Sequence, residues 1–216
     1  IMRDYPEGIR SVILDSPIPL QADYLTDNPA HINASFQQLF DNCAASEECA
    51  TDFPDLEETF YNIVTTLDTE PVVLTVTHPV SGQPFDMLVD GQRFMDTMRW
   101  SMYFSDNIQF LPFIINSVAS GNLSFYKIFA EQLLTTPQYL SEIAHYSYLC
   151  TEEVAFADRD AVTDSIESAR TEAQPYLSID TAITFSVCDE WGLESAADAT
   201  HEAVESDIPT LIISGE

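Results

Sequence analysis

The stretch IPTLIISGE (208–216) predicts a short buried β-strand followed by a turn. Leu211, Ile212 and Ile213 form a compact apolar run behind Pro209, and Ser214–Glu216 indicate the turn that leaves the carboxyl end of the strand. RSVILDSP (10–17) has the same character, with an apolar run between turn signals. Apolar continuity of this kind is typical of strands buried on both faces of a parallel sheet. Binding and catalytic groups of open α/β sheets lie just beyond the carboxyl ends of such strands.

Helical patterns dominate the tract between the two strands. NPAHINASFQQLFDNCAAS (28–46) opens with Asn28–Pro29, which we interpret as an N-cap and first helical residue, and DLEETFYNIVTTLD (55–68) follows the same apolar spacing. PVVLTVTHPVSGQPFDMLVDG (71–91) alternates around Ser81–Gly82 and predicts a β-hairpin. Further helices are predicted at 91–104, 106–120, 123–134, 138–147, 160–170 and 174–187.

The expected fold is therefore mostly α with a small β component. A helical unit with one β-hairpin (21–205) is inserted between two flanking segments, 1–20 and 206–216, each of which carries a core strand of a sheet protein. IMRDYP at the start of 1–20 is typical of the last turn of a helix already under way, so we expect both flanks to continue into a longer chain.

The charge balance is strongly acidic: 36 Asp and Glu residues stand against 7 Lys and Arg residues, for a net charge of −29. A chain with so few cations repels nucleic acid and anionic membranes, because it has no basic surface to neutralise phosphates. It has no apolar run long enough to span a membrane. Two interpretations stay open: a solvated acidic surface suited to a salty or extracellular setting, and an acidic field that attracts cationic substrates.

The even number of cysteines favours two disulfides and an oxidising compartment. Cys43 and Cys49 are close enough in NCAASEECA, a helix end with a short loop, to form one bridge, which leaves Cys150 and Cys188 as a long-range pair. Metal binding is the competing interpretation, but no Cys-x-x-Cys or histidine partner has ligand spacing. We expect neither a metal site nor a cofactor.

No catalytic residue is predicted within the chain. Gly-x-Ser-x-Gly, the signature of a serine nucleophile on a strand–turn–helix, does not occur in the sequence. His31, His78, His145 and His201 carry no triad spacing. His201 begins HEAVE, which resembles a zinc-binding helix, but Glu205 stands where the second histidine should be, so a polar surface helix is the better interpretation.

YLCTEEVAFADRD (148–160) is the candidate binding segment. If Cys150 pairs with Cys188, Glu152 and Glu153 are fixed beside CDEWG (188–192). Carboxylates near an apolar wall of Tyr148, Phe156 and Trp191 would bind a substrate ammonium strongly, because a low dielectric strengthens the ion pair. The alternative is an acidic surface loop beside a structural disulfide.

Aromatic residues are dense between residues 94 and 126. Their helical spacing favours a place in the core of the helical unit, and a substrate-facing surface is the alternative for some of them. They are Phe94, Trp100, Tyr103, Phe104, Phe110, Phe113, Phe125 and Tyr126.

Several separated motifs resemble one branch of the α/β-hydrolases, the proline iminopeptidase and tripeptidyl aminopeptidase family. MRDYPEGIRSVILDSPIPLQADYL (2–25) is similar to the segment after the nucleophile elbow, and FQQLFDNCAASEECATDFPDLEETF (36–60) to the start of the inserted cap with its paired cysteines. The hairpin segment, YLCTEEV (148–154) and CDEWG follow that cap, and IPTLIISGE is similar to the strand before the catalytic aspartate.

The resemblance implies the cap, or lid, of a serine peptidase that is secreted, periplasmic or anchored to the cell envelope. Such an enzyme removes residues from peptide amino termini through a Ser–His–Asp triad and an acyl-enzyme. All three triad positions would lie outside this chain, so it is expected to be inactive alone. The cap would close over the site, and Glu152, with Glu153 as its neighbour, would hold the free α-amino group of the substrate.

The implied partners are a peptide with a free amino terminus and the remainder of the hydrolase core, with possible self-association through exposed strands. Two other functions are compatible with the sequence. One is a stand-alone binding module, without catalysis, for cationic or amino-terminal peptide groups. The other is the lid of an esterase, because the α/β-hydrolase fold serves many chemistries.

Overall fold

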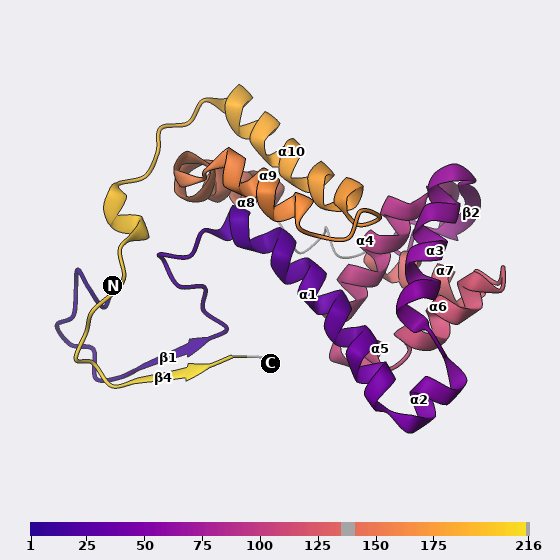
Figure 1. Ribbon diagram of the computed structural model, residues 1–216. Helices are drawn as coiled ribbons and strands as arrows, with labels where there is room; N and C mark the ends of the chain where they lie inside the picture. Colours follow the sequence, from indigo (N-terminus) through magenta and orange to yellow (C-terminus); the bar gives the residue numbers. More distant parts are fainter. Residues whose placement is uncertain (135–140, 215–216) are drawn as a thin grey trace.

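The computed structural model describes residues 1–134 and 141–214, and the fold is mainly helical with two small sheets (Figure 1). The strands are β1 (Val12–Asp15), β2 (Val72–Thr77), β3 (Pro84–Val89) and β4 (Thr210–Ile213). The helices are α1 (Tyr24–Ala45), α2 (Glu47–Asp52), α3 (Leu56–Thr69), α4 (Gly91–Met102), α5 (Ser105–Ile108), α6 (Leu111–Ala119), α7 (Ser124–Leu133), α8 (Glu142–Tyr148), α9 (Arg159–Glu167) and α10 (Gln174–Trp191). A π-helix (η2, Leu149–Glu153) and two 3₁₀ turns (η3, Val154–Phe156; η4, Asp198–His201) complete the elements of the described ranges.

The two predicted core strands pair with each other in parallel. Val12 of β1 lies opposite Thr210 of β4, and the register continues to Asp15 opposite Ile213. A parallel pair requires a crossover connection, and here the whole helical unit forms that crossover (Figure 1). Gly215 and Glu216, assigned from the sequence to the turn after β4, lie outside the described residues.

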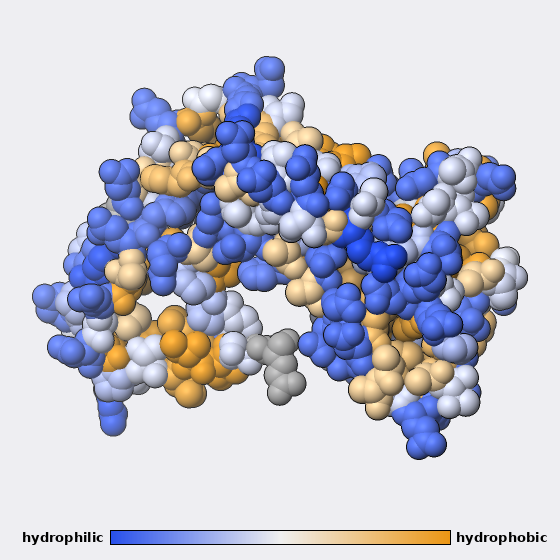
Figure 2. Space-filling model, viewed as in Figure 1, coloured by the Kyte–Doolittle hydropathy of each residue, from blue (hydrophilic) through white to orange (hydrophobic). Residues whose placement is uncertain are grey.

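The strand pair is exposed on both faces within this chain. Ile13 is 68% exposed and Ile212 is 61% exposed, although their apolar character predicts burial. Figure 2 shows the strand pair as an apolar patch at lower left, separated from the helical body by an opening. The prediction of the strands and of their parallel character is confirmed, whereas their burial is not provided by the described residues.

The core lies where α1, α3, α4 and α7 meet. The rings of Phe36 and Phe60 are 5.0 Å apart, those of Phe60 and Phe94 are 5.2 Å apart, and those of Phe94 and Tyr126 are 5.8 Å apart. All of these side chains are at most 1% exposed. Ring pairs at such separations stabilise a fold by about 0.5–1.5 kcal/mol each beyond the burial of their area.

The β-hairpin is confirmed: β2 and β3 are antiparallel, with Val72 opposite Val89, and Gly82 adopts a left-handed φ of 67° in the connecting turn. Val76 and Val89 are fully buried, while Val73 and Leu88 remain exposed. The hairpin therefore turns only part of its apolar surface toward the helices.

Several predicted boundaries are wrong. Asn28–Pro29 does not begin α1, because Asp23 caps it instead by accepting hydrogen bonds from the Thr26 amide (3.1 Å) and hydroxyl (2.7 Å). The segment between Cys43 and Cys49 is not a simple loop, since Ser46 caps the short helix α2. His201 lies in a 3₁₀ turn and is half-buried, not on a surface helix.

The predicted helix over 106–120 is divided into α5 and α6, which changes where the aromatic residues lie. Phe104 and Phe110 occupy the residues that precede α5 and α6, and they are 41% and 51% exposed. Phe94 and Tyr126 are buried as expected. The prediction of a core position is wrong for the others that are exposed, namely Tyr103, Phe104, Phe110, Phe113 and Phe125.

Candidate functional site

The predicted acidic pair lies on the π-helix Leu149–Glu153, which we call the acidic turn. It continues directly from α8, and the disulfide between Cys150 and Cys188 fixes it to α10. Both cysteines are buried, at 4% and 7% exposed. The second predicted disulfide, Cys43–Cys49, joins α1 to α2. Both pairings are confirmed, and two disulfides in one chain are typical of oxidising compartments.

Glu153 and Glu152 have different surroundings. The Tyr148 hydroxyl donates a hydrogen bond to Oε1 of Glu153. Burial, that hydrogen bond and the nearby charges of Glu153 and Glu152 all raise the pKa of Tyr148, so the phenol keeps its proton and remains a donor. The Glu152 carboxylate has no hydrogen bond or ion pair within residues 1–134 and 141–214, so it is the carboxylate of the pair with capacity for a ligand.

The segment after α10 packs against the acidic turn. The amide of Ala196 donates to the Thr151 carbonyl at 2.8 Å, and Nε2 of His201 contacts the Glu152 carbonyl. The His201 ring lies 4.2 Å from the ring of Phe156. The backbone of the acidic turn is thus held by contacts from α10 and from the chain that follows it.

Only part of the predicted apolar wall surrounds the acidic pair. Tyr148 contacts Glu153, and Phe156 stacks on His201, but Trp191 packs on Tyr146 with a centroid distance of 6.4 Å. Asp189 of CDEWG forms a two-point ion pair with Arg159, at 2.6 and 3.1 Å. That carboxylate is therefore occupied by a protein partner.

A cavity of about 570 Å³, unforeseen from the sequence, lies between α4 and α10 and extends toward α1 and α8. Its polar lining includes several charged side chains and tyrosines, and its apolar lining comes from both helices. The lining residues are Tyr24, Leu88, Asp90, Gln92, Arg93, Asp96, Arg99, Trp100, Tyr103, His145, Tyr176, Ile179, Asp180 and Ile183.

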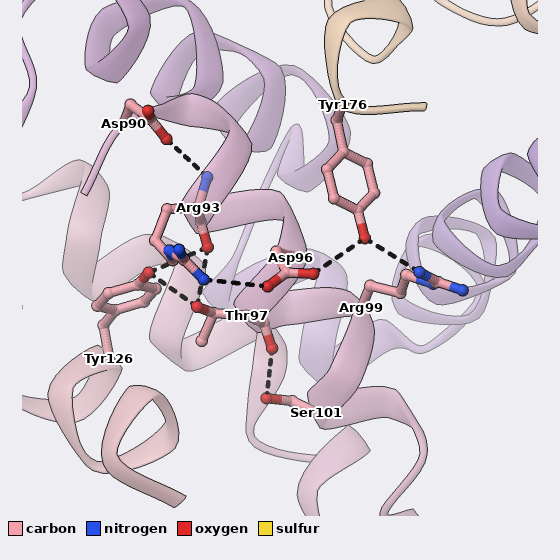
Figure 3. Close-up of polar contacts among 8 residues, drawn as sticks. All are labelled: Asp90, Arg93, Asp96, Thr97, Arg99, Ser101, Tyr126 and Tyr176. Atoms are coloured by element: carbon pink, nitrogen blue, oxygen red, sulfur yellow. Dashed lines mark hydrogen bonds and ion pairs between the residues drawn. The ribbon is translucent and has the colours of Figure 1, made fainter. Parts of the chain in front are cut away.

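A polar network links α4 to α10 in the wall of this cavity (Figure 3). Tyr176, on α10, donates a hydrogen bond to Oδ1 of Asp96 and accepts one from Nη1 of Arg99, each at 3.4 Å. Arg93 forms an ion pair with Asp96 at 3.5 Å. Burial raises the pKa of Asp96, and Arg93, Arg99 and the Tyr176 hydrogen bond oppose that shift. The carboxylate is thus held by protein groups from both helices.

Tyr24, the first residue of α1, connects the cavity to the acidic turn. Burial raises its pKa, Arg99 opposes that shift, and Asp180 and Glu153 add to it. Tyr24 therefore lies within electrostatic range of Arg99 on α4 and of Glu153 on the acidic turn. His145 of α8 also lines the cavity, and α8 continues into the acidic turn, so the two features are neighbours.

Each helix that lines the cavity shows a recognisable local pattern, but the packing of the two helices against each other depends on residues far apart in the sequence. Asp96 and Arg99 are three residues apart on α4, and Tyr176 and Asp180 are four residues apart on α10, so each pair shares a helix face. Nothing in either segment identifies the other as its partner, so the sequence alone does not predict the cavity.

Within the described ranges, no helix combines the length and the apolarity needed to cross a membrane. Comparison with protein-family models, with curated proteins and with solved structures finds no match to this chain. Its function must therefore be argued from its own residues.

Proposed function

We propose that this chain is the lid of an α/β-hydrolase of the serine-peptidase type that removes residues from peptide amino termini. In this proposal β1 and β4 are neighbouring strands of the hydrolase sheet, and the helical unit inserted between them covers the substrate site. The Ser, His and Asp of the triad belong to the remainder of the hydrolase core. Glu152, assisted by Glu153, holds the α-amino group of the substrate.

The parallel pairing of β1 with β4 is the observation that carries the proposal. Parallel sheets are covered on both faces in almost all known cases, and their side chains are apolar on both faces. Ile13, Leu211 and Ile212 have this character and are more than half exposed. An isolated pair of strands is marginally stable in water, so a larger sheet is the physical context that such strands require.

The geometry of the acidic turn supports recognition of an ammonium group. The disulfide to α10 holds the turn, and Tyr148 already satisfies one oxygen of Glu153. The Glu152 carboxylate retains its acceptor capacity. Charge-assisted hydrogen bonds are about twice as strong as neutral ones, and a lid that excludes water strengthens them further.

The reading frame on both sides of the chain provides the direct test. The proposal expects a Gly-x-Ser-x-Gly motif upstream of Ile1, and an Asp followed by a His downstream of Glu216. The chain alone should not hydrolyse aminoacyl or peptidyl nitroanilides. Hydrolysis by the purified chain, or a frame without these motifs, would overturn the lid assignment.

Recognition of the amino group is tested separately with peptides whose carboxyl end is a neutral amide. Tripeptide amides with free amino termini should bind in calorimetry, and their N-acetylated forms should not. Glu152→Gln should weaken binding about tenfold or more, the usual effect of losing a charged hydrogen-bond partner. Glu190→Gln, which removes the same charge from an exposed site near the end of α10, should leave binding unchanged.

These two tests distinguish the lid from a stand-alone binding module. A module predicts selective amine binding in a frame that lacks the triad motifs. Equal binding of free and acetylated peptides would contradict the role of Glu152 in both functions.

A further inference from the structure

Arg99 differs from the other half-buried cations, because no carboxylate of the described residues lies within ion-pair distance of it. Among the described residues, ion pairs with Asp or Glu are formed by Arg3, Arg93, Lys127, Arg159 and Arg170. Arg10 forms none, but it is exposed to solvent. In a protein with 36 acidic residues, a half-buried guanidinium without a carboxylate within ion-pair distance indicates a place for an external anion.

The contacts of Arg99 within residues 1–134 and 141–214 use only a small part of its hydrogen-bonding capacity. Nη1 donates a long hydrogen bond of 3.4 Å to the Tyr176 hydroxyl, and the guanidinium lies 5.5 Å from the Trp100 ring centroid. A guanidinium has five N–H donors, arranged to match a carboxylate. Burial lowers the pKa of Arg99, but Tyr176, Tyr103 and Asp180 raise it by more, so the side chain stays charged.

The space around Arg99 can accommodate a small organic ligand. Arg99 lines the 570 Å³ cavity and also a neighbouring hollow of about 280 Å³ beside α1. Trp100, Tyr103 and Ile183 supply apolar surface in the larger cavity. Pockets of about 300–1,000 Å³ that combine apolar walls with a few polar groups are typical of small-molecule sites.

A second cavity contains an arginine that is paired with carboxylates of the protein itself. It measures about 460 Å³ and lies beside the α2–α3 connection, with Arg170 in its lining. Arg170 forms ion pairs with Glu57 at 2.7 Å, with Glu172 at 3.5 Å and with Glu58 at 3.8 Å. Arg170 is thus paired directly with protein carboxylates, whereas Arg99 has none within ion-pair distance among the described residues and interacts with Asp96 and Asp180 only at longer range.

We propose that the cavity between α4 and α10 binds an organic carboxylate, which pairs with Arg99 while its apolar part packs against Trp100 and Tyr103. The carboxylate can come from a peptide carboxyl terminus or from an acidic side chain. The proposal stands on the cavity alone and does not require that the chain be a hydrolase lid.

Asp180 provides a control that distinguishes a bound anion from a bound cation at this site. Within the described ranges its carboxylate has no hydrogen bond or ion pair, and its charge acts on Arg99, Tyr24 and Tyr176. A bound carboxylate is repelled by Asp180, whereas a bound cation is attracted by it. Removing this charge must therefore change the two kinds of binding in opposite directions.

The test compares N-acetylphenylalanine with N-acetylphenylalanine amide by calorimetry and by ligand-observed NMR. The acid should bind and the amide should not. Acetyl-Phe-Glu-amide, whose only carboxylate is on the side chain, shows which source the cavity accepts. None of these probes has a free amino group, so failure here is distinguishable from failure of amine recognition at Glu152.

Arg99→Gln should weaken binding of the acid by about tenfold to a hundredfold, as loss of a charged bidentate partner does. Arg10→Gln, with the same loss of charge at an exposed position, should leave it unchanged, and Asp180→Asn should strengthen it.

Circular dichroism checks that each variant is folded, and Tyr103→Ala, at an exposed wall residue, gives a second variant that should bind less. Equal binding of acid and amide, no binding of either carboxylate probe, or weaker binding of the acid in Asp180→Asn would overturn the proposal.

Discussion

Tyr61 lies where the aromatic core meets a surface cluster of charges. Its ring packs edge-on against Phe60 at 5.1 Å, and the guanidinium of Arg170 lies 4.3 Å from its centroid. Burial raises the pKa of Tyr61 to about 12, although the positive charge of Arg170 opposes the shift. The phenol therefore stays neutral in the folded protein at a pH where it would ionise in the unfolded chain.

This difference predicts a loss of stability in alkaline solution. The pKa is raised from 10.0 to about 12 in the folded state, so the contribution of Tyr61 is fully present below pH 10 and is lost as the pH rises through about 12. Tyr61→Phe should lose less free energy of unfolding than the wild type between those values, as measured by urea unfolding at successive pH values. Tyr5→Phe, at a residue that is 73% exposed, is the control. If Tyr61→Phe followed the wild-type pH dependence, as the control should, the raised pKa of Tyr61 would be contradicted.

At the scale of elements, α3 and α4 are in close contact at Gly91. A Cβ atom on this residue would lie 2.4 Å from the Val64 carbonyl oxygen and 2.6 Å from Oδ1 of Asp68. The Gly91 amide also donates to that Asp68 oxygen at 3.0 Å. The absence of a side chain therefore allows the amino terminus of α4 to pack on α3.

Gly91→Ala should separate the two helices and destabilise the protein by about 1–3 kcal/mol, the usual cost of overpacking. Thermal and urea unfolding measure the change. Gln92→Ala, at the next residue of α4, should stay within about 0.5 kcal/mol of the wild type. An unchanged Gly91→Ala protein would show that α3 and α4 are less tightly packed than described.

The two disulfides should contribute unequally to stability. In the chain-entropy account, a bridge that closes a longer loop restricts the unfolded chain more. Replacing Cys150 and Cys188, separated by 38 residues, with alanine should cost about 4 kcal/mol, and replacing Cys43 and Cys49, separated by 6, about 2 kcal/mol. Urea unfolding of the two double variants gives the comparison, and a larger loss for the short loop would contradict this ranking.

Local patterns predicted most elements but not all of their ends. Apolar spacing identified α1, α3 and α4, and alternation identified the hairpin, because those signals depend on neighbouring residues only. The start of α1 was misplaced because Asn28–Pro29 and Asp23 both fit a helix start, and only the hydrogen bonds to Thr26 select Asp23. Residues 138–140 of the helix predicted at 138–147 lie outside the described residues, and α8 begins at Glu142 after its N-cap Ser141.

The candidate site was predictable only in part for a related reason. Glu152 and Glu153 could be singled out because Cys150 stands beside them and predicts an anchor on Cys188. The cavity at Arg99 depends on packing between α4 and α10, which are far apart in the sequence. The π-helix that carries the acidic pair could not be distinguished from a loop, because five residues are too few to show a helical apolar period.

At the scale of the whole molecule, an exposed apolar strand pair coexists with a net charge of −29. Unpaired strand edges and apolar faces promote association, whereas like charges oppose it and salt weakens that opposition. The chain should therefore self-associate increasingly as salt and protein concentration rise. The domain boundaries expected at residues 20/21 and 205/206 also remain predictions.

Sedimentation velocity and light scattering test this expectation. Ile13→Lys combined with Ile212→Lys should abolish association, because both side chains lie on the exposed strand pair. Ile143→Lys, at a residue of α8 that is 73% exposed, should not. A strictly monomeric wild type at high salt and high concentration would contradict the prediction.

The contacts between the acidic turn and the segment after α10 have a mechanical consequence. Ala196 and His201 attach that segment to Thr151 and Glu152, and the chain then runs through residues 202–209 directly into β4. Only the irregular residues 202–209 therefore lie between the segment attached to the acidic turn and the first residue of β4. If Glu152 binds a ligand as proposed, these residues are the stretch of backbone along which a movement of the acidic turn would reach β4.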